Sequence, residues 1–263
     1  MPYLDVNSTR LYYHWAGEFD PARETVVFLH DGLGATSSWR NLPEQITAAH
    51  HLNALVYDRH GYGQSSPRSD FPYQFMEGEV PVLEALLDAL KLEKVHLVGH
   101  SDGGSISLLF AAQHPHRVRS MVTIAAHVFV EPETQSGIRD LVALQNSGKT
   151  PGWLLKLHGE KAEDLLRSWS DGWLSEMHAQ WNIERWLPDV KTPLLVVQGD
   201  ADEFGTTAQV VAITSRVDGA ASWIVPGCGH TPHNQQPEAF LDQLKAFYET
   251  YGVGNHSQPP ASS

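Results

Sequence analysis

The chain has 263 residues and a formal net charge of −13, from 31 acidic and 18 basic residues. A surface this acidic repels phosphate backbones and anionic lipid headgroups, so we expect neither nucleic acid nor a membrane as a partner. The sequence has one cysteine, no signal-peptide pattern at its start and no run of 18 apolar residues, which predicts a cytoplasmic protein.

Six short apolar segments are typical of strands, in chain order at 25–30, 53–58, 94–99, 119–124, 193–198 and 222–225. Apolar residues fill the first five continuously instead of alternating, as in strands covered on both faces. Helical periodicity lies between them, at 80–92, 103–114 and 237–251. This alternation predicts an α/β fold with a doubly wound, mostly parallel sheet.

The pattern changes between the fourth and fifth strands, where helical stretches carry five of the eight tryptophans. We expect residues 131–188 to form a helical cap on a core made of residues 1–130 and 189–252. A tryptophan-rich insertion between two strands is typical of a lid over an apolar cleft. Trp153 and Trp173 are its candidate substrate contacts, and the other rings are expected to form its own small core. Residues 253–263 are small and polar, which predicts a flexible tail.

Residues 99–103 read Gly-His-Ser-Asp-Gly, a G-x-S-x-G motif directly after a predicted strand and directly before a predicted helix. That context is the one in which the motif marks a nucleophilic serine. A sharp strand-to-helix turn forces the serine into a strained backbone conformation and lifts its hydroxyl above the sheet. The sequence therefore predicts Ser101 as a nucleophile.

A serine hydroxyl needs a base to take its proton, and two histidines after the last strand are candidates. We favour His230 over His233, because the glycines before His230 suit a loop that approaches the turn closely. The base needs a carboxylate to orient it, and Asp202 stands far enough past the fifth strand to serve. Asp200 is expected to cap the turn there, and Glu203 to face solvent or to support Asp202.

The negative charge that develops during acyl transfer needs hydrogen-bond donors, collectively an oxyanion hole. One expected donor is the backbone N–H of Asp102, directly after the nucleophile. The other is expected from the loop after the first strand, where the sequence leaves Gly32 and Leu33 as alternatives. The histidines are scattered outside any metal-ligand motif, so we expect no metal site.

The motifs FLHDGLG, GHSDGG, QGDADEFG and GCGHTPH together resemble the α/β-hydrolase superfamily, and the turn DRHGYGQS resembles its turn after the second parallel strand. Within it, the chain is similar to the valacyclovir hydrolase (biphenyl hydrolase-like) group. The resemblance implies a Ser–Asp–His triad, no cofactor and hydrolysis of carboxylic esters or related bonds. In that group the acidic residue after the nucleophile, here Asp102, is linked to recognition of an amino group. The chain departs from its relatives at Asp31, where many have glycine, and at His100, where the group has tryptophan.

Asp31 and Asp102 lie beside the predicted nucleophile and are candidates for substrate binding. Two carboxylates there would favour a cationic or hydroxylated substrate and repel an anionic one. Equally, Asp102 could complement the first turn of a helix, and Asp31 could hydrogen-bond to its own loop. The sequence leaves both alternatives open.

The favoured function is hydrolysis of small carboxylic esters through an acyl-enzyme, with amino-acid esters as one candidate class of substrate. The same residues also suit carbon–carbon bond hydrolysis, perhydrolysis or cofactor-free dioxygenation. A third alternative is a receptor that binds a ligand and has a catalytically inactive hydrolase fold, because a fold does not dictate the function of the protein that adopts it. The expected partner is a small-molecule substrate, and the sequence does not predict an oligomeric state.

Overall fold

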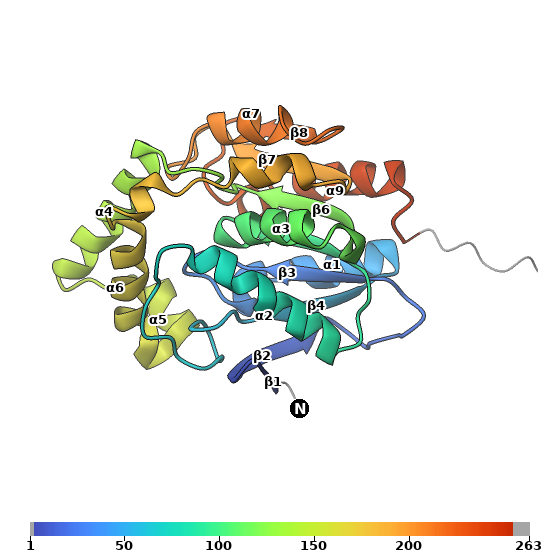
Figure 1. Ribbon diagram of the computed structural model, residues 1–263. Coiled ribbons are helices and arrows are strands. Elements are labelled where there is room, and N and C mark those ends of the chain that lie inside the picture. The colour runs from blue at the N-terminus through green and yellow to red at the C-terminus, as the bar shows by residue number, and fades with distance from the viewer. Residues whose placement is uncertain (1–2, 255–263) are drawn as a thin grey trace, which may run out of the picture.

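Eight strands form one sheet in the computed structural model, which describes residues 3–254 (Figure 1). The strands are β1 Tyr3–Val6, β2 Thr9–Trp15, β3 Thr25–Leu29, β4 Asn53–Tyr57, β5 Val95–His100, β6 Val118–Ile124, β7 Leu194–Gly199 and β8 Ala221–Val225. The α-helices are α1 Leu42–His50, α2 Phe75–Ala89, α3 Asp102–Gln113, α4 Pro132–Asn146, α5 Gly152–His158, α6 Ala162–Trp173, α7 Ala208–Thr214, α8 Pro232–Gln235 and α9 Pro237–Thr250. Short 3₁₀ helices cover Thr36–Trp39, Pro115–Arg117, Gly159–Lys161, His178–Gln180 and Glu184–Asp189.

The sheet order is β1-β2-β4-β3-β5-β6-β7-β8. The pairs β1–β2 and β2–β4 are antiparallel, and every later pair is parallel. Val27 of β3 pairs with Leu55 of β4 on one side and with Leu97 of β5 on the other. The carboxyl ends of six strands therefore meet at one edge, which is where ligands bind in sheets of this kind.

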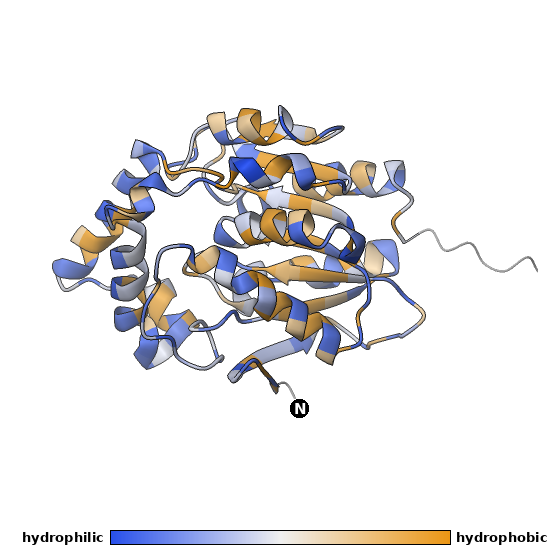
Figure 2. Ribbon diagram, viewed as in Figure 1, coloured by the Kyte–Doolittle hydropathy of each residue, from blue (hydrophilic) through white to orange (hydrophobic). Residues whose placement is uncertain are grey.

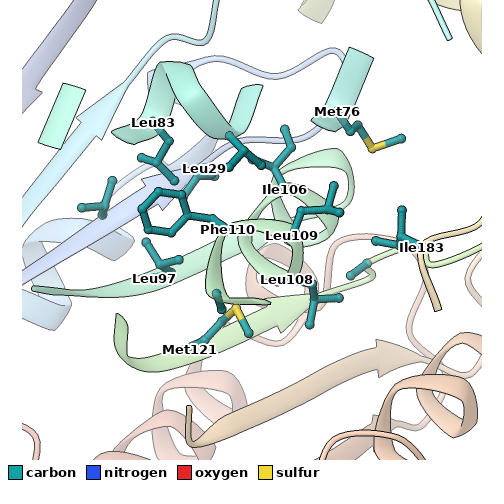
Figure 3. Packing of buried hydrophobic residues seen from close by; sticks show 14 of the residues in the cluster. Leu29, Met76, Leu83, Leu97, Ile106, Leu108, Leu109, Phe110, Met121 and Ile183 are labelled. Carbon is teal, nitrogen blue, oxygen red and sulfur yellow. The ribbon is translucent and has the colours of Figure 1, made fainter. Parts of the chain in front are cut away.

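The sheet carries an apolar core on each face. Along β3, Val26 and Phe28 belong to the core packed by α1 and α9, whereas Val27 and Leu29 belong to the core packed by α2, α3 and α7. Successive side chains of a strand point to opposite faces, so a continuous apolar run supplies both cores. Figure 3 shows Phe110 of α3 among the side chains of the second core, and Figure 2 shows the same apolar band along the strands.

The predicted cap region contains α4, α5 and α6, which follow β6 and gather at one end of the sheet (Figure 1). Trp173 and Trp181 are 1% exposed, with ring centroids 6.1 Å apart. His178 stacks on Trp181 at 5.5 Å. Both tryptophans belong to the same apolar cluster as α2 and α3, and Phe75 of α2 contacts Trp173 at 6.3 Å. The expectation that most of these rings form a separate core of the cap is therefore wrong.

The predicted strands agree with the observed ones to within one residue at each end. The predicted helix 80–92 is wrong at both ends, because α2 begins at Phe75, continues through Pro81 and ends at Ala89. Proline normally occupies the first turn of a helix, which is why the sequence pattern places the start near residue 80. Burial of Phe75 and Met76 against the core stabilises the earlier turn.

Sequence reasoning missed β1 and β2, the antiparallel hairpin at the sheet edge. Their side chains are mostly half-exposed and polar or aromatic, so they lack the continuous apolar runs that marked the other strands. The tyrosines and threonine of TRLYYHW are the signal that could have found β2.

The expected tail, 253–263, begins with Val253, which is 6% exposed in the core packed by α9. Residues 255–263 lie outside the described part of the chain. Within residues 3–254, no helix combines the length and apolarity needed to span a bilayer. In the same range, no three His, Cys, Asp or Glu side chains are grouped so that they could share a metal ion.

Candidate active site

Ser101 lies at the sharp turn between β5 and α3. Its backbone angles are φ 51° and ψ −121°, a region that a non-glycine residue occupies only when its surroundings hold it there. The turn depends on close backbone approach. A Cβ atom at Gly99 would collide with the Gly103 carbonyl, and one at Gly103 would collide with the Leu29 carbonyl. The strained strand-to-helix turn that the motif predicts is present.

The loops after β7 and β8 bring Asp202 and His230 together. His230 Nδ1 lies 2.8 Å from Asp202 Oδ1 and 2.9 Å from Oδ2. The carboxylate also accepts hydrogen bonds from the Gln198 amide at 2.6 Å and from the Phe204 backbone N–H at 2.8 Å. Because an ionised carboxylate only accepts hydrogen bonds, a neutral His230 carries its proton on Nδ1 and leaves Nε2 as a base.

The same contacts set the protonation states of the pair. Burial alone would lower the pKa of His230, but the charge and hydrogen bond of Asp202, followed by the charges of Asp31 and Glu203, raise it above 6.5. Burial alone would raise the pKa of Asp202, but the charge and hydrogen bond of His230 lower it. At neutral pH the carboxylate is therefore ionised beside the imidazole.

Ser101 and His230 line one cavity of about 670 Å³ under the predicted cap. Both residues are largely buried, at 7% and 9% exposure. Within the described residues, no hydrogen bond joins the Ser101 hydroxyl to the imidazole, whose bonds go to Asp202. Hydrogen bonds of this kind often tighten only when substrate binds.

Asp102 and both alternatives for the loop donor, Gly32 and Leu33, border the same cavity. Asp102 is the first residue of α3, where backbone N–H groups have no partner within the helix. Gly32 lies directly against it, because a Cβ atom at Gly32 would lie 2.8 Å from Asp102 Oδ2. Leu33 is one residue further, and its carbonyl accepts a hydrogen bond from His158 of α5 at 2.8 Å. The contact with Asp102 favours Gly32 as the loop donor.

All four expected substrate-binding residues, Asp31, Asp102, Trp153 and Trp173, line this cavity. Trp173 is 1% exposed, whereas Trp153 is 47% exposed on α5. Sequence reasoning missed Trp169, which also lines the cavity and donates from Nε1 to Asp102 Oδ2 at 3.2 Å. Its place among five tryptophans gave no signal that could single it out.

Each of the two cavity carboxylates faces a basic side chain inside the protein. Asp102 Oδ2 lies 3.7 Å from Nη2 of Arg59, and both side chains are almost fully buried. Asp31 Oδ1 lies 3.6 Å from Nδ1 of His100. Burial raises the pKa of Asp102, with Arg59 and Trp169 opposing it. Burial also opposes ionisation of Asp31, but His100 holds the pKa of Asp31 well below its usual range.

The competing residues have other contacts. His233 is 4% exposed, its Nε2 lies 3.1 Å from the Asn234 amide nitrogen, and its ring packs against Trp39 at 5.2 Å. Asp200 accepts a hydrogen bond from the Gly227 backbone at 2.7 Å, as expected of a residue that caps the turn. Only His230 of the two histidines bonds to Asp202. The geometry favours His230 as the base.

The fold and this site define the class of protein. A family model described as the alpha/beta hydrolase fold matches residues 24–186, so the chain belongs to the α/β-hydrolase family. It is 31% identical over 258 residues to the serine hydrolase BPHL of Homo sapiens, covering 94% of this chain and 84% of that protein. The resemblance to the biphenyl hydrolase-like group is thereby confirmed.

Two further comparisons bear on the chemistry of a relative and on the fold. A 2-hydroxy-6-oxononadienedioate/2-hydroxy-6-oxononatrienedioate hydrolase of Pseudomonas putida is 26% identical, over 88% of each chain. The crystal structure of MGS-M2, an α/β-hydrolase from a Medee basin deep-sea metagenome library, superposes with a TM-score of 0.77 at 20% identity. That match covers 99% of this chain and 100% of the other. The comparisons therefore support a hydrolase and leave the bond that it cleaves to be determined.

Proposed function

We propose that the protein is a serine hydrolase that cleaves small carboxylic esters through an acyl-enzyme. The observation that carries the proposal is the His230–Asp202 pair, which lines the same cavity as Ser101 at its strained turn. Water, a carboxylic ester and these side chains suffice for the reaction, so no cofactor is invoked. We expect the cytoplasm as the compartment, where the free Cys228 thiol would stay reduced.

Each step has a group to perform it. Ser101 Oγ attacks the ester carbonyl carbon while His230 Nε2 takes the hydroxyl proton, and Asp202 stabilises the resulting imidazolium. The oxyanion is bound by the backbone N–H groups of Asp102 and Gly32. Collapse of this intermediate breaks the C–O bond, and His230 returns the proton to the departing alcohol. Water then attacks the acyl-enzyme by the same route, releasing the acid and restoring Ser101.

We propose further that the acyl group is neutral. The resemblance implies an amino-group site at Asp102, but Arg59 lies 3.7 Å from that carboxylate inside the protein. His100 is placed in the same way beside Asp31. The buried charge of Arg59 offsets the negative charge of Asp102 that would attract an ammonium group. The apolar lining by Ile138, Leu141 and Leu157 suits an uncharged substituent.

The preference for neutral esters can be measured with matched substrates. We expect the p-nitrophenyl ester of alanine, at a pH where its amine is protonated, to show no higher kcat/KM than the p-nitrophenyl ester of 2-methylpropanoate. The two differ only by an ammonium in place of a methyl group. An advantage for the amine above about tenfold, or roughly 1.4 kcal/mol, would contradict the neutral preference and restore Asp102 as an ammonium site.

The pH profile should report the His230–Asp202 contact. Since His230 acts as a base only when neutral, kcat/KM should rise with pH and level off above an apparent pKa that lies above 6.5. Asp202→Asn removes the charge that contributes most to raising this pKa, so the apparent pKa should fall. The plateau should also drop by roughly 10³–10⁴-fold, because the imidazolium loses its stabilising carboxylate. An Asp202→Asn profile with an unchanged apparent pKa would disprove the pairing. Asp200→Asn is the matched control, with the wild-type profile expected.

Carbon–carbon hydrolysis is the second candidate, because a relative named for hydrolysis of a keto-dienedioate covers most of the chain. A panel of short p-nitrophenyl esters, lactones and vinylogous 1,5-diketones distinguishes the two reactions. We expect the highest kcat/KM on an ester or a lactone. If the diketone were cleaved and no ester or lactone were, the ester proposal would fail while Ser101 could keep its role.

A further inference from the structure

Arg59 is a fully buried cation that the proposed reaction does not use. It follows β4, and its side chain is 0% exposed. Its Nη2 donates to the Asp31 backbone carbonyl at 2.9 Å and lies 3.7 Å from Asp102 Oδ2. Its guanidinium lies over the Tyr62 ring at 4.5 Å. Nε and Nη1 are buried and have no hydrogen-bond partner within the described residues. A buried guanidinium with unsatisfied donors is a poor way to stabilise a fold, so its two polar contacts call for another reason.

The Asp31 carbonyl is held from several directions. His30 donates to it from Nδ1 at 2.8 Å, Arg59 from Nη2 at 2.9 Å, and the Gly34 backbone N–H at 3.2 Å. The tautomer of His30 is fixed, because the backbone N–H of Arg59 donates to its Nε2 at 3.0 Å. Burial and the charge of Arg59 keep the pKa of His30 well below its usual value, so the ring stays neutral. The carbonyl therefore points in one direction.

That carbonyl belongs to the same planar peptide unit as the N–H of Gly32. In a trans peptide the two bonds point in opposite directions, so fixing the carbonyl also fixes the N–H. A cationic donor on the carbonyl also polarises the peptide and makes its N–H a stronger donor. The second contact of Arg59 reaches the turn itself, through the side chain of Asp102.

We infer that Arg59 is a positioning residue of the oxyanion hole. It links the Asp31–Gly32 peptide to the Asp102 side chain. In this way it keeps the backbone N–H groups of Gly32 and Asp102 at a fixed distance from each other. This inference rests on the proposed acyl-transfer function. It also identifies Gly32 as the loop donor, because the Asp31 carbonyl that Arg59 holds is in the same peptide unit as the Gly32 N–H.

The test compares Arg59→Met and Arg59→Lys with Arg68→Met. Arg68 is a matched control, because it is also largely buried, pairs with Glu79 at 2.8 Å and lies over the Phe71 ring at 4.7 Å. Arg59→Met should lower kcat by roughly 10–100-fold with KM changed less than about twofold, somewhat less than the loss of a whole oxyanion donor. Affinity for a trifluoromethyl ketone, which adds Ser101 Oγ to form a bound oxyanion, should fall by the same factor. Arg59→Lys keeps the positive charge but lacks the planar guanidinium group. Its kcat and its affinity for the ketone should therefore lie between those of the wild type and of Arg59→Met.

A spectroscopic readout separates this inference from the proposed function. The Gly32 amide resonance should shift upfield in Arg59→Met, because its peptide loses polarisation, shift less in Arg59→Lys, and stay in place in Arg68→Met. Unchanged kcat, ketone affinity and Gly32 resonance in a folded Arg59→Met protein would overturn the inference, even if the wild type hydrolyses esters. If Arg59→Met does not fold, the same three readouts on Arg59→Lys decide. A wild type that hydrolyses no ester refutes the proposed function alone, since the Gly32 resonance still tests Arg59.

Discussion

Replacing Ser101 by alanine should lower kcat/KM for the best ester by roughly 10⁴–10⁶-fold, as loss of a nucleophile does in other serine hydrolases. The substitution removes the only atom that forms the covalent bond in the proposed mechanism. It leaves the oxyanion donors and the cavity in place, so KM should change little. Stopped-flow or steady-state assays with a p-nitrophenyl ester measure the loss.

The matched control is Ser107→Ala. Ser107 lies on the same helix, is fully buried, and donates its hydroxyl to the Gly103 carbonyl at 2.7 Å. That variant loses one internal hydrogen bond, worth about 1 kcal/mol of stability, and should keep activity within about threefold of wild type. Ester hydrolysis that survives in Ser101→Ala but not in Ser107→Ala would refute the assigned nucleophile.

Replacing His230 by alanine should cost roughly 10⁴-fold or more in kcat/KM, because it removes the base that accepts the serine proton in the proposed mechanism. His233→Ala should cost less than about tenfold, although it removes a similar buried ring from α8, only three residues further along the chain. Its ring packs against His100 at 4.8 Å and Trp39 at 5.2 Å, so the loss should come mainly from looser packing. Activity assays together with thermal unfolding of both variants separate chemistry from stability.

The outcome that contradicts this assignment is a reversal of the two effects. Were His233→Ala inactive and His230→Ala active, the His230–Asp202 contact would be structural only. Comparable losses in both variants, in step with their loss of stability, would also count against a base at His230.

Sequence alone predicted the parts of the site that depend on local pattern and on chain order. Ser101 is marked by its glycines and by the strand and helix on either side. Asp202 and His230 follow from the rule that loops after parallel strands meet at one edge of the sheet. Each of these residues occupies the expected loop, and the six predicted strands lie where expected.

Contacts between distant loops could not be predicted in this way. The approach of Arg59 to Asp102, of His100 to Asp31 and of Trp169 to Asp102 depends on side-chain directions in five different segments. These are the loops after β3 and β4, strand β5, and helices α3 and α6. No periodicity or spacing encodes those directions. They bear on charge and specificity, which explains why the sequence left the roles of Asp31 and Asp102 open.

Covalent labelling of the wild type tests the central claim most directly. A fluorophosphonate should add once per chain, and peptide mapping by mass spectrometry should place the adduct on Ser101, with ester turnover lost in proportion to labelling. An adduct on another residue, or full turnover by a protein that stays unlabelled, would contradict the mechanism proposed for this site.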